Sequence, residues 1–420
     1  MAANRKKKTK TDAPSAVMPL ASAQGGFGQE LVNWLFPAYV TLIVLCVGAF
    51  VTRWTMVQGH EMPLDRAVLT AVNSATLTGF PQSVSPNWFK TPGQILVLLL
   101  TLAGSLFSLL TGGLAVSRIL KLPFSDAQIV RAALLAELIA LILGAFGLCG
   151  TGPGLLSGLS QGAAAFGNSG MSLGTPFGLD DWQTHLIVLP MAFIGGLGIT
   201  VLIELYHAAI GGRKISNHAG KVLAMSFGLY LVALLVILGL RWFVTSGGNG
   251  DFRSLLASTS AVAIDSRTAG FPLEMAHLWP RYMQWMVMLL MMIGGSPGGT
   301  AGGLKTTTVV ALAQGTRRTL RGQLPGRQFG IALSWLGIYL AVALIGFLML
   351  VGAEPQTEAD RLGFLTISGL SNVGLATDAV NITARGSYIL SALMLCGRMV
   401  PLLVLWWMAD TTSDADLAVG

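Results

Sequence analysis

Charged residues are scarce in this chain. Only 11% of its 420 residues are Asp, Glu, Lys or Arg, whereas a soluble globular domain carries about 25%. Hydrophobic residues make up 53%. So few charges cannot cover a water-facing surface, and this scarcity excludes an ordinary soluble protein.

Cysteine is nearly absent as well. Cys46, Cys149 and Cys396 are the only three, and all fall in segments that we expect to be spanning helices. We therefore interpret them as packing residues, which excludes a disulfide or cysteine–metal framework. The five histidines show no spacing typical of metal ligands, and no nucleophile–base pair or paired-carboxylate site stands out. An enzyme is not indicated.

Long apolar runs are what the sequence does have. Eight segments are long enough to cross about 30 Å of hydrocarbon as a helix. Six lack charge and two tolerate it; they are residues 31–51, 91–117, 182–203, 222–240, 283–304 and 329–352, with 127–149 and 387–409. The first run is too long for a cleaved signal peptide, so we expect it to be the first span. The sequence predicts an all-α polytopic membrane protein.

The net charge of +7 is unevenly distributed. If the N-terminus lies inside, most basic residues fall on inside segments and most acidic residues on outside segments. This distribution follows the positive-inside rule and predicts cytoplasmic N- and C-termini. The N-terminal run RKKKTK is then a solvated tail near anionic membrane lipid, and a nucleic-acid partner is not expected.

Four short motifs centred on glycine recur between the spans. They read TLTGF (76–80), GNSGM (167–171), RTAGF (267–271) and SNVGL (371–375), and their glycines at 79, 170, 270 and 374 are 91, 100 and 104 residues apart. This period predicts four pseudo-repeats of helix–pore loop–helix. We place them at 30–122, 123–212, 213–322 and 323–410, between tails at 1–29 and 411–420.

A helical stretch too short to span precedes each glycine, for example residues 64–75 and 252–263. Non-helical backbone at membrane depth is tolerated where it lines a water-filled cavity. We therefore expect four half-length pore helices and four loops around one central ion pore. One such motif alone is typical of an ordinary turn; four at matched positions favour a pore.

These loops suit a dehydrating monovalent cation. Rings of backbone carbonyls replace the ion's water shell without fixed charge, glycine permits the required backbone angles, and helix C-termini add partial negative charge. The candidate selectivity filter comprises Thr78, Gly79, Asn168, Ser169, Gly170, Thr268, Ala269, Gly270, Asn372, Val373 and Gly374, with the ion at the four glycines.

The motifs resemble the Trk/Ktr/HKT superfamily of potassium transporters, especially the TrkH and KtrB membrane subunits. Beyond the loops, the resemblance rests on IGGLGITV (194–201), IGGSPGGTAGGLKTTT (293–308) and GRMVPL (397–402). It covers the chain from about residue 30. It implies potassium uptake across the bacterial inner membrane, a homodimer, and separate cytoplasmic nucleotide-binding subunits of the TrkA/KtrA type. No covalent cofactor is implied.

The second loop departs from the family pattern, which more often shows two asparagines where this chain reads GNSGM. Met171 follows the glycine there and is flexible. The central residue is glycine in all four loops. Because family members with serine at the first position tend to favour sodium, the resemblance implies potassium here; a sodium-permeable or ion-coupled transporter is the alternative.

The glycine-rich stretch in the third repeat would break a straight helix. The resemblance implies an intramembrane gate there, formed by Gly294, Gly295, Gly298, Gly299, Thr300, Gly302, Gly303, Lys305 and Arg398. The alternative is close packing of small residues between helices. A phosphate-binding loop is excluded, because Leu304 stands where that motif needs glycine before its lysine.

Three basic residues lie at membrane depth, where a charge on a lone helix costs about 2.5–3.5 kcal/mol. We expect Arg398 to donate hydrogen bonds to carbonyls of the glycine-rich stretch and hold it shut; an ion pair elsewhere is the alternative. Lys305 is expected to repel cations near the inner cavity. Arg267 is expected to brace the filter from behind, with Asp265 or a neighbouring pore helix.

Two other classes of protein fit less well. A secondary transporter with broken helices predicts inverted repeats, whereas these four units run in the same sense. A membrane-embedded enzyme needs catalytic polar residues that converge at depth, and the sequence shows none.

Overall fold

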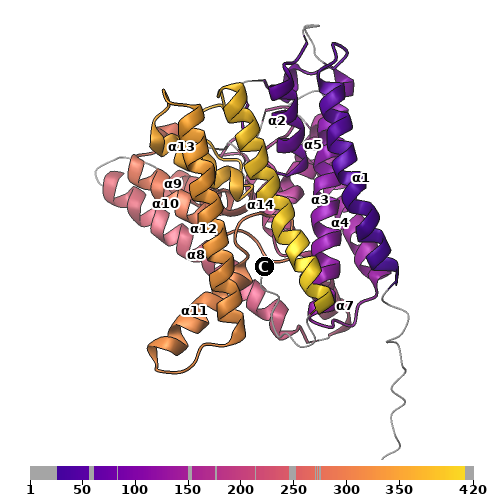
Figure 1. Ribbon diagram of the computed structural model, residues 1–420, viewed down its shortest axis with the longest axis vertical. Coiled ribbons are helices and arrows are strands. Elements are labelled where there is room, and N and C mark those ends of the chain that lie inside the picture. The colour runs from indigo at the N-terminus through magenta and orange to yellow at the C-terminus, as the bar shows by residue number, and fades with distance from the viewer. Residues whose placement is uncertain are drawn as a thin grey trace, which may run out of the picture.

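The chain is described by a computed structural model over residues 26–55, 61–82, 84–149, 154–175, 177–212, 214–245, 252–269, 271, 273 and 276–411. Gly270, the basic N-terminal run and the C-terminal tail after residue 411 lie outside the described residues. Within these ranges there are fourteen α-helices and no β-strand (Figure 1). The predicted all-α class is confirmed.

Six helices are long and apolar enough to cross a membrane. They are α1 (Gly26–Phe50), α3 (Thr91–Ile119), α4 (Asp126–Gly147), α8 (Asn217–Thr245), α12 (Arg327–Ala353) and α14 (Ala384–Thr411). In α1, α8 and α12 only 22% of the most apolar window is buried, against 67% in α3. Most helices therefore turn apolar side chains outward, as a lipid-facing surface requires, and α3 lies at the centre.

Four half-length helices alternate with the long ones. They are α2 (Leu64–Ala75), α5 (Leu155–Gly167), α9 (Phe252–Ile264) and α13 (Ala359–Leu370), and all lie in the upper half of Figure 1. At 1.5 Å per residue, each reaches roughly 20 Å, too short to span. The predicted pore helices at 64–75 and 252–263 are confirmed.

Two predicted spans are not continuous helices. Residues 182–203 form a π-helical turn (Thr184–Val188), α6 (Leu189–Gly195) and α7 (Ile199–Gly211), with a bend of 113° between α6 and α7. Gly198 makes this elbow with φ +91°, a value that favours glycine. The prediction of an unbroken span failed because average hydropathy does not register such a break.

The run predicted to span at 283–304 is helical only in its first half, and it ends at the glycine-rich stretch that was expected to break the helix. The helix α10 (Arg281–Met291) stops there, and α11 (Thr306–Leu320) begins 15 residues further on. The glycine-rich stretch between them is non-helical, with positive φ at Gly298 and Gly303. Six glycines within ten residues remove side-chain support and carry a large entropic cost in a helix.

The cysteines are placed differently from the prediction. Cys46 is buried in α1, as expected, but Cys149 is exposed and follows the end of α4 at Gly147. Cys396 lies in α14 but is exposed. The helix α4 ends early because its last turn gives way to a glycine-rich connection.

The helices α4 and α5 approach each other along a line of glycines. A Cβ on Gly162 would crowd the carbonyl oxygen of Ala140, and one on Gly158 would crowd that of Gly144. Small residues allow backbones within a membrane to pack this closely. The contact fixes the second pore helix against the first long helix of its repeat.

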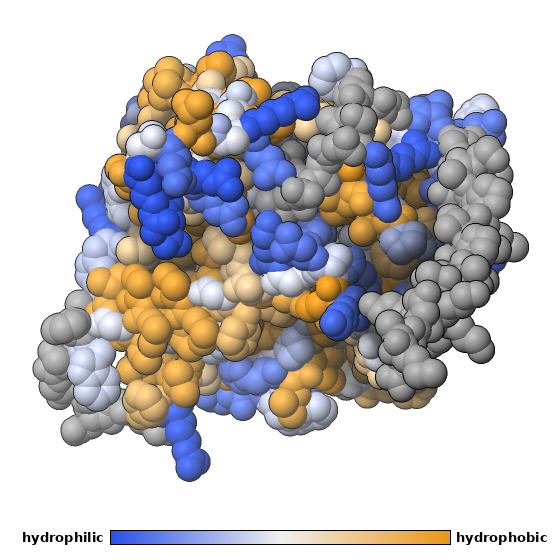
Figure 2. Space-filling view, turned by 90° about the horizontal axis from the view of Figure 1, so that it is seen from below, coloured by the Kyte–Doolittle hydropathy of each residue, from blue (hydrophilic) through white to orange (hydrophobic). Residues whose placement is uncertain are grey.

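The face opposite the pore helices carries the ends of α7 and α11 (Figure 1). Figure 2 shows this face, on which hydrophilic side chains spread between hydrophobic patches. The basic residues Arg317, Arg318 and Arg321 at the end of α11 belong to this end of the molecule. Its polar surface contrasts with the apolar sides of the long helices.

Candidate ion pathway

Three pore helices end in the same hydrogen-bonded turn. Leu77, Asn168 and Asn372, each two residues before a filter glycine, have φ between +51° and +59°. In each turn, the residue just before the glycine donates its backbone N–H to the carbonyl of the residue five positions earlier. The donor and acceptor residues are Thr78 and Asn73, Ser169 and Ala164, and Val373 and Ser368, at distances of 2.9–3.1 Å. This is the Schellman ending, and it directs the chain into the loop identically in repeats one, two and four.

These three loops meet. A Cβ on Gly79 would overlap the backbone of Gly170, and one on Gly374 would overlap the carbonyl of Thr78. Gly79 and Gly374 also have φ of +83° and +89°, where glycine alone is unstrained. The first loop therefore abuts both the second and the fourth, backbone against backbone.

A second glycine holds each of these pore-helix ends. Gly104, Gly195 and Gly397 lie on the helix that follows the loop, and each faces a carbonyl four residues before the filter glycine. A Cβ would overlap that oxygen in every case; the carbonyls belong to Ala75, Phe166 and Leu370. This role was not predicted, although the sequence carries a signal for it: Gly104, Gly195 and Gly397 follow the central glycines of their loops by 25, 25 and 23 residues.

Side chains brace the first and fourth loops from behind. Asn73 pairs with the backbone of Phe80 through both amide atoms, at 2.9 and 3.0 Å. The predicted residues Thr78 and Asn372 are joined, since the Asn372 amide donates to the Thr78 hydroxyl at 3.0 Å. Tyr39 on α1 donates to the Ala75 carbonyl at 2.5 Å. Asn73 and Tyr39 gave no signal in the sequence because their partners are set by the tertiary fold.

The third loop differs from the other three. Residues Asp265–Ala269 form a π-helical turn, and the Phe271 N–H donates to the Asp265 carboxylate at 2.6 Å. Of the predicted filter residues here, Thr268 and Ala269 belong to this turn, and Gly270 lies outside the described residues. The structure therefore brings together the filter residues of repeats one, two and four.

The glycine-rich stretch lies against the ends of the pore helices. The Thr300 hydroxyl donates to the Phe166 carbonyl at 2.9 Å and accepts from the Asn168 amide at 2.7 Å. On the other side, a Cβ on Gly302 would overlap the Ser371 carbonyl. The stretch therefore lies in direct contact with the C-terminal ends of the second and fourth pore helices.

The elbow between α6 and α7 holds the same stretch. The Ser296 N–H donates to the Gly196 carbonyl at 2.9 Å, and the Ile199 N–H donates to the Gly298 carbonyl at 3.2 Å. The Thr300 N–H donates to the Gly195 carbonyl at 3.1 Å. Backbone groups that a broken helix leaves unpaired are therefore satisfied by the glycine-rich stretch, as burial requires.

Arg398 is buried and joins the first pore helix to this stretch. Its Nε and Nη2 donate to the Thr76 carbonyl at 2.8 and 2.6 Å, and Nη1 donates to the Thr300 carbonyl at 2.6 Å. Nη1 also lies 3.3 Å from the Ser108 hydroxyl. The expected hydrogen bond to the glycine-rich stretch is present. A guanidinium suits this position because its fixed fork presents several donors at once.

The other two buried cations also bind carbonyls. Lys305 donates to the Ala301 carbonyl at 2.8 Å, within the stretch itself. Arg267 donates to the Gly294 carbonyl at 3.1 Å and the Ser226 carbonyl at 3.3 Å. Arg267 was expected behind the filter with Asp265 or a pore helix; these two hydrogen bonds instead tie the start of the glycine-rich stretch to α8.

A side chain at position 374 would separate the loops. We expect Gly374→Ala to lower the apparent unfolding temperature by several degrees, because the variant adds both an overlap with the Thr78 carbonyl and strain at positive φ. Gly212→Ala is the matched control, since Gly212 has φ +61° and open space around it. Thermal unfolding in detergent measures both. An equal loss of stability in the two variants would contradict the packed contact between the loops.

Comparisons with known proteins identify relatives of this sequence. A family model described as "Cation transport protein" (TrkH) matches residues 261–411. The potassium/sodium uptake protein NtpJ of Enterococcus hirae is 26% identical over 394 residues, covering 81% of this chain and 84% of NtpJ. The Ktr system potassium uptake protein B of Bacillus subtilis is 26% identical over 410 residues, covering 88% of this chain and 91% of that protein.

A solved structure shows the same fold. The potassium transporter TrkH from Vibrio parahaemolyticus superposes with a TM-score of 0.69 over 91% of this chain and 85% of that chain, at 17% sequence identity. The family model and the curated relatives add the sequence likeness that the fold alone does not carry. Together these findings show that this chain is similar in sequence to the Trk and Ktr potassium uptake proteins and shares the fold of TrkH.

Proposed function

We propose that this chain takes up potassium through a filter made by the four glycine loops. The observation that carries the proposal is the meeting of the first loop with the second and the fourth at Gly79, Gly170 and Gly374. Potassium is supported by the names of the relatives, among them the Ktr potassium uptake proteins of Bacillus subtilis and Vibrio alginolyticus. Gly270 supplies the fourth position in this proposal.

The chemistry of the proposal is backbone coordination. An ion between the loops gives up water and gains carbonyl oxygens, and it leaves readily because those oxygens carry no net charge. The pore helices add partial negative charge from their C-terminal ends. Side chains such as Thr78 and Asn372 fix the backbone and leave the axis to carbonyls.

A filter that also admits sodium is the second candidate. It is favoured by one observation, the name of the relative NtpJ as a potassium/sodium uptake protein. Glycine at the first filter position supports potassium. The two candidates differ in ion selectivity and share the pathway.

We propose that the glycine-rich stretch, residues 292–305, is the gate. It lies against Phe166, Asn168 and Ser371 at the ends of two pore helices, and Arg398 ties it to a third. An ion leaving the filter on that side meets it directly. Its glycines permit the backbone rearrangement that opening requires, and its few hydrogen bonds to side chains set the energy of the closed position.

The remaining features of the proposal concern the assembly. The chain acts as a homodimer in the bacterial inner membrane, with both termini cytoplasmic and the four repeats bounded as given above. TrkA/KtrA-type subunits carry the regulatory nucleotide and dock on the face in Figure 2. Arg317, Arg318 and Arg321, exposed at the end of α11, are the basic residues available to them. The proposed transport function needs the transported ion as its substrate, and it involves no covalent cofactor and no catalysis.

Ion flux into liposomes tests the filter. Purified protein is expected to carry K⁺ and Rb⁺ in preference to Na⁺, and Gly79→Ser should reduce that preference by roughly tenfold, or about 1.4 kcal/mol. The cause is a side chain placed where the first and second loops touch. Gly48→Ser is the control, because Gly48 lies on α1 with nothing near it. Equal passage of Na⁺ and K⁺, unchanged by Gly79→Ser, would refute the filter.

Loss of the Thr300 hydroxyl tests the gate. Thr300→Val removes two buried hydrogen bonds, each worth about 1 kcal/mol, so we expect K⁺ flux without a regulatory subunit to rise by roughly tenfold or more. Thr307→Val is the control, since the buried Thr307 hydroxyl has no partner in the part of the chain that the structure describes. Arg398→Ala should raise flux in the same direction. Unchanged flux and gating in both Thr300→Val and Arg398→Ala would contradict the gate.

A further inference from the structure

A groove runs along the outside of the molecule between α4 and the bent pair α6–α7. Its volume is about 640 Å³. The bent pair turns by 113° between α6 and α7, and residues of both helices and of α4 form the walls of the groove. The elbow that holds the glycine-rich stretch therefore also borders this groove.

The groove is apolar over most of its length. Leu135, Ile139 and Leu143 project from α4, and Ile194 from α6; all four are exposed, by 42–55%. Side chains of this kind on a spanning helix contact acyl chains. A groove of this volume and apolar lining fits one or two acyl chains lying along α4.

One end of the groove is polar and basic. Arg131 lies close to the start of α4, and Tyr206 and His207 lie near the end of α7, at the lower end of Figure 1. Arg131 is exposed and has neither a hydrogen bond nor an ion pair to any residue that the structure describes. Its positive charge is therefore available to an anionic group at the level where lipid headgroups lie.

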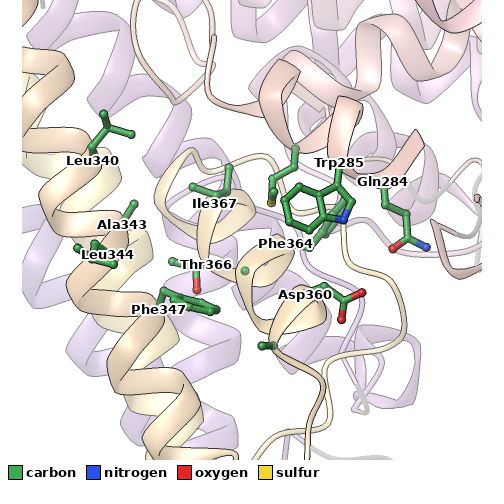
Figure 3. A pocket seen from close by; sticks show the side chains of 13 residues that line it. Gln284, Trp285, Leu340, Ala343, Leu344, Phe347, Asp360, Phe364, Thr366 and Ile367 are labelled. Atoms are coloured by element: carbon green, nitrogen blue, oxygen red, sulfur yellow. The ribbon is translucent and has the colours of Figure 1, made fainter. Parts of the chain in front are cut away.

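A second cavity, between α10, α12 and α13, differs from this groove in the charged residue at its rim (Figure 3). It measures about 500 Å³ and is also largely apolar. The charge at its rim, Asp360, lies 3.8 Å from the Arg281 guanidinium. The groove between α4, α6 and α7 differs from this cavity because the charged residue at its end, Arg131, has no ion-pair partner among the residues that the structure describes.

We propose that this groove binds an anionic phospholipid, with acyl chains along α4 and α6 and the headgroup phosphate at Arg131. Tyr206 suits the same position, because tyrosine is favoured at the membrane–water interface. The proposal concerns a ligand other than the transported ion, and its binding does not require the proposed transport activity.

Two residues that line the groove also hold the glycine-rich stretch in place through their backbone groups. Phe166 and Ile199 line the groove, and their backbone groups are the ones bonded to Thr300 and Gly298. A bound lipid therefore packs against the elbow that positions the stretch. Lipid occupancy is expected to stabilise that arrangement.

Lipid binding to the full-length purified protein tests the proposal. Native mass spectrometry with added phosphatidylglycerol or phosphatidylcholine measures the preference for the anionic headgroup. Wild type should prefer phosphatidylglycerol, and Arg131→Gln should weaken that binding by about fivefold, the loss expected for one basic residue near an anionic headgroup. Ile139→Trp should lower binding of both lipids by filling the groove.

Arg317→Gln is the matched control, because Arg317 is exposed on α11, away from the groove; its lipid preference should equal that of wild type. An equal affinity of wild type for the two lipids would overturn the proposal. So would a preference retained in Arg131→Gln, or a change of oligomeric state in Ile139→Trp, which would assign the groove to a second copy of the chain. Flux is not the readout, so failure here leaves the proposed transport function standing.

Discussion

The architecture depends on backbone contacts that only glycine allows. Gly104, Gly195 and Gly397 each admit the last carbonyls of a pore helix, and Gly79 and Gly374 then bring the loops together. Any side chain at these positions would push a pore helix away from the centre. Since each pore helix is only 12 or 13 residues long, its place is set by these few contacts. The geometry of the loops therefore follows from glycine packing one layer behind them.

The buried cations continue the same arrangement. Arg398 gathers the carbonyls of Thr76 and Thr300 around one guanidinium, so that the first loop and the glycine-rich stretch share a single anchor. Lys305 and Arg267 bind carbonyls of the same stretch. A charge at membrane depth is tolerated when such partners surround it. The helix breaks supply the partners, because they leave carbonyls free of helical bonds.

Sequence patterns predicted the elements whose signals are local. Length and hydropathy gave the six long helices, and the glycine period gave the pore helices, with α2 predicted at its observed residues 64–75. The break at Gly195–Gly198 was not predicted, because apolar composition continues through it, whereas the glycine-rich stretch after Met291 was expected to break its helix. The partners of Asn73 and Tyr39, and the role of Gly104 among 52 glycines, depend on contacts between distant segments. The type of partner that Arg398 binds could be predicted, because a cation at membrane depth needs carbonyl or carboxylate partners.

The central claim is that the glycine loops enclose one site for a dehydrated monovalent cation. Anomalous diffraction from crystals grown in Rb⁺ tests it most directly. The account predicts a peak between the loops, within coordination distance of backbone carbonyls near Gly79, Gly170 and Gly374. A well-occupied Rb⁺ site elsewhere within the membrane-spanning part of the molecule, with no density between these loops, would contradict it.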